Sequence, residues 1–235
     1  MKYLYLYINI SCIIIPFLFS FVLKHKFYKE WKYFIPANLI ISFFFLVWDY
    51  YFVEWGVWGF NSRYLTDIYI SSIPLEECLF FFCIPYACVF TYFILREYNL
   101  PCILKLKKIR ISRMIIILAS ITCLIVSISN YEKLYTFSTF TLLFFLLLFC
   151  IINKIDLRII SFSYIFIIPF FLISNGVLTG SFIDEQVVWY NNLENLNRRI
   201  FTIPYEDYFY GYLLISLNIL LYEKFRINRT NVPLS

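Results

Sequence analysis

Apolar residues in this chain come in runs of about 20, separated by short segments that carry most of the charge. A helix of that length crosses the roughly 30 Å hydrocarbon core of a bilayer. Helices are expected because strands and loops exposed to lipid leave backbone N–H and C=O groups unpaired. The pattern predicts seven transmembrane helices, at 3–23, 34–53, 74–95, 113–129, 134–152, 159–179 and 203–222.

The composition agrees with an all-α integral membrane protein. The 235 residues are 62% hydrophobic, 23% aromatic and 15% charged, against roughly 25% charged in soluble domains. The first run resembles a signal peptide by position, but it is long and lacks a small-x-small cleavage site, so it is interpreted as a span. Without any C-x-x-C pair, the seven cysteines are expected to be small buried hydrophobes: Cys12, Cys78, Cys83, Cys88, Cys102, Cys123 and Cys150.

The basic residues predict the topology of these helices. Of the 20 Lys and Arg, 15 fall in alternate connections on one side and in the C-terminal tail, leaving 5 on the other side. Basic loops remain cytoplasmic, so we expect the N-terminus outside and the C-terminus in the cytoplasm. Clusters such as LKLKKIRISR are therefore topology signals, and a nucleic-acid partner is not expected.

An internal repeat organises the chain. The stretches IPLEECLFFF (73–82) and IPYEDYFYGY (203–212) align at an offset of 130, and each follows a long loop rich in aromatic residues and Asn. Both stretches begin a helix on the outer side, so the repeats run in the same sense and need one extra crossing between them. We expect two parallel three-helix repeats, at 1–98 and 133–235, joined by a linker helix within 99–132.

Each repeat places a proline and two adjacent carboxyl groups at the start of an apolar helix: Glu76 and Glu77 in the first, Glu206 and Asp207 in the second. Helix capping is the simpler interpretation, since proline and acids favour the first turn. A cap needs only one acid, however, and ionisable residues within a membrane are functional candidates by default. The doubled pair therefore favours chemistry.

Helical spacing puts aromatic rings one turn beyond these acids: Phe80 and Phe81 in the first repeat, and Phe209 and Tyr210 in the second. Two adjacent carboxyls out of water disfavour double ionisation, so one could keep a proton, although the helix dipole acts in the opposite direction. Such an acid can protonate an alkene, and aromatic faces stabilise the resulting cation. The chain lacks the histidine clusters of di-iron enzymes, a dinucleotide-binding G-x-G-x-x-G stretch and the D-x-x-x-D motif of metal-dependent prenyl transfer. The class of reaction that remains is acid–base catalysis on an apolar substrate, and neither a cofactor nor a metal is expected.

The chain resembles the lycopene cyclase domain family, the small membrane-integral carotenoid cyclases that use no flavin. The resemblance covers nearly the full length and is carried by WDYYF, GVWGFN and PLEE in the first repeat, and by NGVLTG, VVWYN and RRIFTIPYEDYFYGY in the second. In that family the two three-helix units occur as separate subunits or, as here, fused. The resemblance implies a multi-pass protein of the bacterial cytoplasmic membrane that isomerises lycopene, closing β-ionone rings without net oxidation or reduction.

The resemblance makes Glu76, Glu77, Glu206 and Asp207 the candidate acids and bases. Asp49 and Asn175, near the outer ends of their helices, are expected to orient those carboxyls. Weaker candidates for shaping the pocket or pairing a carboxylate are Trp58, Asn61, Trp189, Tyr190, Asn191 and Arg199. The aromatic belt of membrane proteins also explains tryptophan and tyrosine at this depth.

Other interpretations remain open at this level. An isoprenoid transporter or lipid-binding protein could use the acids to carry protons, although they lie at helix starts rather than at the midplane. A cyclase for another linear isoprenoid fits the same residues, whereas a purely structural subunit fits poorly with two units in one chain. The expected partners are lycopene or a related linear carotenoid and membrane lipid, and a homo-oligomer is left open.

Overall fold

The computed structural model describes residues 2–98 and 113–230, which form a helical bundle. Seven α-helices lie in this part of the chain, and the prediction of an all-α membrane fold is confirmed. They are α1 (Leu4–Val22), α2 (Trp31–Glu54), α3 (Leu75–Glu97), α5 (Arg113–Ser129), α6 (Leu134–Ile152), α7 (Arg158–Leu178) and α8 (Tyr205–Thr230). Two short 3₁₀-helices, η1 (Phe27–Glu30) and η2 (Ser62–Tyr64), complete the helical segments.

Five helical segments of the described chain are long and apolar enough to cross a membrane: α1, η1 with α2, α3, α6 and α7. Helix α5 is apolar but has only 17 residues. Helix α8 is not among the five, and it continues eight residues beyond its predicted end at 222. Its last turns are charged, and Glu223 pairs with Arg96 of α3 while Arg226 pairs with Glu30 of η1. These ion pairs support the helix where the apolar pattern has ended.

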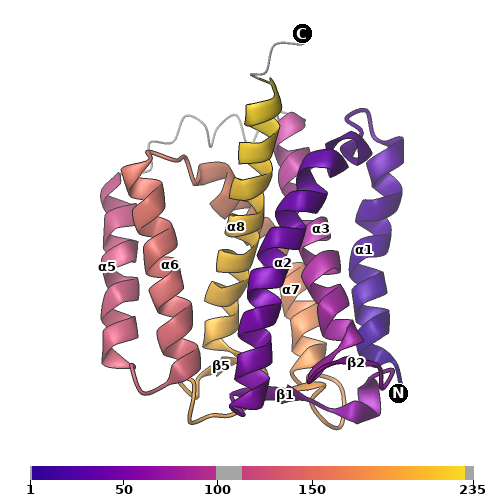
Figure 1. The fold of residues 1–235 in the computed structure, drawn as a ribbon, viewed down its shortest axis with the longest axis vertical. Coiled ribbons are helices and arrows are strands. Elements are labelled where there is room, and N and C mark those ends of the chain that lie inside the picture. The colour runs from indigo at the N-terminus through magenta and orange to yellow at the C-terminus, as the bar shows by residue number, and fades with distance from the viewer. Residues whose placement is uncertain (1, 99–112, 231–235) are drawn as a thin grey trace.

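The two three-helix units, α1–α3 and α6–α8, interlock. Helices α3 and α8 both begin at the lower end in Figure 1, the end at which the described chain starts, so the units run in the same sense as predicted. The middle helix of each unit packs on the third helix of the other, α2 on α8 and α7 on α3. Helix α5 packs on α6 at the outer edge of the bundle. This exchange brings the starts of α3 and α8 to one shared region.

A short antiparallel ladder joins the two long loops. Strand β1 (Trp58–Phe60) pairs with β4 (Val188–Tyr190), with Gly59 opposite Trp189. These two residues are themselves equivalent at the offset of 130, so exchanging the units maps the ladder onto itself. The flanking bonds obey the same rule: Asn61 N–H donates to Val187 O at 2.9 Å, and Asn191 N–H to Val57 O at 2.8 Å. A pseudo-twofold axis therefore passes through the ladder.

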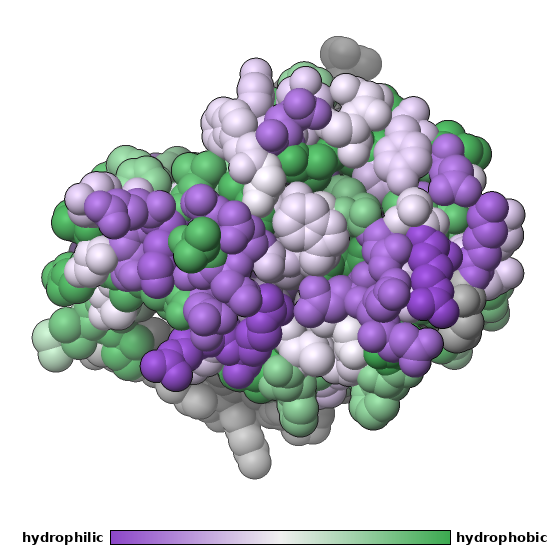
Figure 2. Space-filling model, turned by 90° about the horizontal axis from the view of Figure 1, so that it is seen from below, coloured by the Kyte–Doolittle hydropathy of each residue, from purple (hydrophilic) through white to green (hydrophobic). Residues whose placement is uncertain are grey.

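Two equivalent hairpins lead into the helices that carry the acids. Strand β2 (Tyr69–Ile70) pairs with β3 (Ile73–Pro74) before α3, and β5 (Arg199–Ile200) pairs with β6 (Ile203–Pro204) before α8. Both hairpins turn through a non-glycine residue with positive φ, Ser71 at 58° and Phe201 at 56°. Figure 2 shows this end of the molecule with its polar loop residues around a paler centre and apolar side chains toward the rim.

Part of the sequence prediction falls outside the described residues. Of the linker within 99–132, the structure describes α5 and the turn after it, whereas 99–112, with Cys102 and nearly all of LKLKKIRISR, is not described. The boundaries 1–98, 99–132 and 133–235 stay predictions. Of the six described cysteines, all of them free, four are buried and two, Cys12 and Cys78, are partly buried.

Candidate active site

The second acid of each repeat reaches a single cavity. Glu77, in the first turn of α3, and Asp207, in the first turn of α8, both line a cavity of about 610 Å³ between α1, α3, α7 and α8. Glu77 is 7% exposed and Asp207 is 5% exposed. The two carboxyls are close enough to interact electrostatically. Residues separated by 130 positions in sequence therefore belong to one site.

The first acid of each pair, Glu76 or Glu206, binds the preceding loop instead of lining the cavity. Glu76 accepts a hydrogen bond from Thr66 N–H at 2.6 Å, and Glu206 accepts one from Leu196 N–H at 2.7 Å, again equivalent positions. Glu206 also accepts from the Thr136 hydroxyl at 2.6 Å. In both glutamates Oε2 is buried without a hydrogen-bond partner among the described residues. Neither lines the cavity, and both hold the preceding loop against the start of their helix.

A tyrosine from the first helix of each unit donates to the second acid. The Tyr5 hydroxyl of α1 donates to Glu77 Oε2, and the Tyr135 hydroxyl of α6 donates to Asp207 Oδ1 at 2.6 Å. Sequence reasoning missed both tyrosines. Extending the offset of 130 from the acid motif back to the first helix of each unit would have matched them, since both positions hold tyrosine.

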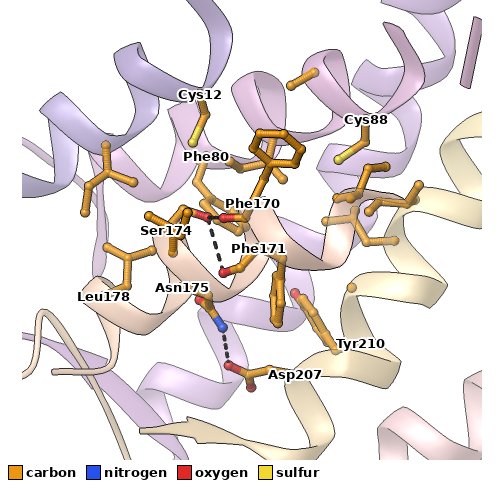
Figure 3. A pocket seen from close by; sticks show the side chains of 18 of the residues that line it. Cys12, Phe80, Cys88, Phe170, Phe171, Ser174, Asn175, Leu178, Asp207 and Tyr210 are labelled. Carbon is orange, nitrogen blue, oxygen red and sulfur yellow. Dashed lines mark hydrogen bonds between the residues drawn. The ribbon is translucent and has the colours of Figure 1, made fainter. Parts of the chain in front are cut away.

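Two further donors reach Asp207 from the second unit. Asn175 Nδ2 of α7 donates to Asp207 Oδ2 at 2.8 Å, and Figure 3 shows this amide pointing from α7 toward the carboxyl. The Tyr190 hydroxyl of β4 donates to the same oxygen at 3.0 Å. Burial and the neighbouring Asp207 charge raise the pKa of Tyr190 well above its usual value, so its hydroxyl keeps its proton and remains a donor.

A third carboxyl, that of Asp49, lies beside Glu77. Asp49 lies five residues before the end of α2, lines the cavity and is 1% exposed. Its Oδ1 accepts from Trp58 Nε1 at 2.5 Å, while its Oδ2 is buried with no hydrogen-bond partner in the described part of the chain. Asp49 and Glu77 interact electrostatically. None of the three cavity acids, Asp49, Glu77 and Asp207, forms an ion pair with another described residue.

Aromatic rings surround the acid end of the cavity. Trp58 packs edge-on against Tyr135 and Tyr210, with ring centroids 5.0 and 6.2 Å apart. Tyr190 stacks on Tyr135 at 5.9 Å. Figure 3 shows Tyr210 beside Asp207, with Phe80 farther along the cavity. The negative faces of such rings can stabilise a cation that forms between them.

Beyond the acids, the cavity is long and apolar. Along α3 its lining runs from Glu77 to Thr91, a rise of about 21 Å at 1.5 Å per residue. Cys12 and Cys88 line its inner part. Ile15 of α1 and Phe170 and Ile173 of α7 also line it while being more than 60% exposed. The cavity therefore opens sideways between α1 and α7, onto the lipid-facing flank.

The remaining predicted site residues lie outside the lining. Phe81 is buried against Phe45 in the bundle core. Asn61 donates to Glu185 Oε2 at 2.9 Å in the loops, and Asn191 Oδ1 accepts from Leu193 N–H.

Trp189 and Arg199 also lie outside the lining of the cavity. The indole of Trp189 lies over Gly59 and is 42% exposed. Arg199 donates to Thr202 O at 2.8 Å and lies over the Tyr190 ring at 5.8 Å. Among the described residues, the contact of Arg199 with the site is through the Tyr190 ring.

This arrangement defines a membrane-embedded helical protein that buries acids at one end of an apolar slot. A family model described as lycopene cyclase matches residues 2–95 and 132–225, two segments of equal length related by the same offset of 130. The chain belongs to the lycopene cyclase family, and this membership supports a carotenoid cyclase function in general. Searches of curated proteins and of solved structures found no match. Helix α5 lies outside both matched segments.

Proposed function

We propose that the protein is a lycopene β-cyclase that isomerises the open ends of lycopene to β-ionone rings. The observation that carries the proposal is the convergence of Glu77 and Asp207, one from each repeat, on a single apolar cavity. An acid and a base within one site are what a proton-in, proton-out isomerisation needs. The substrate and product have the same composition, so the reaction consumes no oxidant or reductant.

The bonds change in a fixed order. A carboxyl group protonates the terminal double bond of the open end, which leaves a tertiary carbocation. The π electrons of a nearby double bond attack that centre, close the six-membered ring and move the positive charge into it. A carboxylate then removes a ring proton, and the C–H electron pair becomes the ring double bond. Trp58 and Tyr210 line the cavity where the cation forms.

The shape of the cavity supports a membrane-dissolved substrate. The lining is apolar beyond the acids and opens between α1 and α7 toward lipid. A linear hydrocarbon could enter from the bilayer end first, with its reacting end at the acids and the rest of the chain along the slot. Exclusion of water also protects a carbocation from being trapped as an alcohol.

The proposal extends to the organisation of the protein in the cell. Residues 1–98 and 133–235 are the two catalytic repeats, and 99–132 is the linker that lets them run in the same sense. The proposal places the protein in a bacterial cytoplasmic membrane, and the excess of Lys and Arg on one side favours an orientation with the N-terminus outside. A reporter protein that is active only in the cytoplasm should therefore be active when it is fused to the C-terminus.

Expression in a lycopene-accumulating bacterium tests the activity. The wild type should convert red lycopene into cyclic carotenes, identified by chromatography and mass spectrometry at unchanged mass. Glu77→Gln and Asp207→Asn should impair formation of the β-ring product while the protein remains in the membrane. Glu132→Gln and Asp184→Asn make the same chemical changes at exposed positions and should retain conversion. Unchanged lycopene with inserted wild-type protein would reject the proposal and favour another isoprenoid or transport.

A further inference from the structure

The two halves of the site have lost their symmetry. Glu77 and Asp207 are equivalent, and each accepts from an equivalent tyrosine. The two additional donors to Asp207, however, have no counterpart at Glu77: Tyr190 corresponds to Phe60 in the ladder, and no described residue of α2 donates to Glu77 as Asn175 of α7 donates to Asp207. Among the described residues, therefore, Asp207 accepts from three hydrogen-bond donors and Glu77 from one.

Glu77 has a different neighbour instead. Asp49 of α2 adds a second carboxyl next to Glu77, whereas α7, the middle helix of the second unit, contains no Asp or Glu. Hydrogen bonds from neutral donors favour the ionised form of a carboxyl, whereas a nearby carboxylate disfavours it. The surroundings thus push the two equivalent groups toward opposite protonation states, which is how paired carboxyls take different roles.

The geometry points to a fixed division of labour: Glu77, supported by Asp49, is the acid that protonates the alkene, and Asp207 is the base that removes the ring proton. This assignment rests on the proposed cyclase function and deepens it. Asn175 and Tyr190 are positioning residues that hold Asp207 in its ionised form. Asp49 is a positioning residue that keeps the proton on Glu77.

The proton balance closes within the cavity. Glu77 gives a proton to the terminal carbon and becomes a carboxylate, and Asp207 receives the ring proton and becomes a carboxylic acid. Transfer of that proton back to Glu77 restores the starting state. Both groups line the same cavity and interact, so no external acid or base is consumed in a cycle.

Product analysis of two variants separates the roles. Glu77→Gln removes the acid, so conversion should fall by roughly 10²- to 10⁴-fold, with the remaining pigment unchanged lycopene. Asp207→Asn leaves the acid in place, so rings should still form, but the cation loses a different proton or is trapped by water. Its products should include rings with a shifted double bond or an added hydroxyl. Misfolding alone would not change the identity of the product.

A gain-of-donor variant tests the broken symmetry directly. Phe60→Tyr places a hydroxyl at the position equivalent to that of Tyr190, near Glu77. The added donor favours the ionised form of Glu77, so the basic limb of the pH–rate profile should move to lower pH. Phe182→Tyr adds the same hydroxyl to a ring that is 97% exposed and should leave the profile unchanged.

The results that overturn the assignment are specific. Unchanged lycopene with Asp207→Asn together with shifted or hydroxylated rings from Glu77→Gln would reverse the roles. Only β-rings from Asp207→Asn, or equal loss of conversion in both variants with no new product, would reject the division. In each of these cases wild-type conversion shows that the cyclase proposal survives, whereas a wild type that leaves lycopene unchanged rejects the cyclase itself.

Discussion

Gly59 and Trp189 face each other across the β1–β4 ladder at the pseudo-twofold axis of the molecule. They are equivalent in the repeat, yet one has no side chain and the other has the largest. The difference lets the Trp189 ring lie directly on the Gly59 backbone: a Cβ built on Gly59 would come within 2.7 Å of Trp189 Cε2. The ladder joins the loops that carry Trp58 and Tyr190, so its fit affects both sides of the site.

Gly59→Ala should therefore disturb the site through the ladder. Overpacking of this kind costs about 1–3 kcal/mol, and we expect a lower melting temperature in detergent together with reduced cyclisation. The double variant Gly59→Ala/Trp189→Ala removes the clash and should recover much of both. Gly176→Ala is the matched control, because its Cβ would meet the nearest atom, Ser181 Oγ, at an ordinary 3.5 Å. Equal melting temperatures for Gly59→Ala and wild type would contradict this account.

The sequence predicted the helices and the repeat because both depend on patterns that are local or strictly periodic. Runs of apolar residues define the spans, and the offset of 130 relates the proline–carboxylate motifs. It could not say which acid of each pair enters the cavity. Neighbouring residues on a helix point about 100° apart, so only one of Glu76 and Glu77 can face the same space. Aromatic residues follow both Glu76 and Glu77 in the sequence and do not distinguish them. Which of the two faces the cavity depends on how α3 packs against α1 and α7.

The first acids should matter for stability rather than for the reaction. Glu76→Gln and Glu206→Gln keep an oxygen that accepts from the loop N–H groups, so conversion should remain within about threefold of the wild type, a loss below roughly 1 kcal/mol. Glu206→Ala leaves the partly buried Leu196 N–H and the buried Thr136 hydroxyl without this acceptor, at up to about 1–3 kcal/mol for each group. Thermal unfolding in detergent measures this loss. Abolished conversion in the Gln variants at normal stability would instead assign the first acids to the chemistry.

The donors to the carboxyls show a second limit of sequence reasoning. Asn175 is a candidate because it lies near the outer end of its helix, and Tyr190 because it belongs to the VVWYN stretch of the long loop; both reach Asp207. Tyr5 and Tyr135 lie about 70 residues from the acids they contact. Their contact depends on the packing of α1 on α3 and of α6 on α8, which no local pattern reports.

The length of the cavity predicts a dependence on substrate size. Ala87 lines the cavity ten residues beyond Glu77 on α3, which places it about 15 Å from the acid end. Ala87→Phe should obstruct the slot there, and an overpacking cost of about 1–3 kcal/mol corresponds to a loss of roughly 5- to 150-fold in lycopene conversion. A shorter linear isoprenoid with the same end group should still be cyclised, because the acids are untouched.

The matched control for the slot is Ala119→Phe, on an exposed position of α5 away from this cavity. Pigment extracts and assays in vesicles with both substrates give the comparison. Equal loss for the short and the long substrate would mean that Ala87→Phe damages the acid end, and unchanged lycopene conversion would mean that the chain does not occupy the slot.

Asp49→Asn tests the carboxyl that the second repeat lacks. The amide keeps the size of the side chain and an oxygen that can accept from Trp58 Nε1, so the fold should be retained. It removes the negative charge beside Glu77, and Glu77 then ionises more readily because like-charge repulsion is lost. The basic limb of the pH–rate profile should therefore move to lower pH, by about one unit for each 1.36 kcal/mol of lost repulsion. Cyclisation should be weak at neutral pH and recover as the pH is lowered.

The measurement is lycopene conversion in vesicles across a pH series, with Asp184→Asn as the exposed control. A profile of reduced height but unchanged position would show that Asp49 supports the structure without acting on the proton of Glu77.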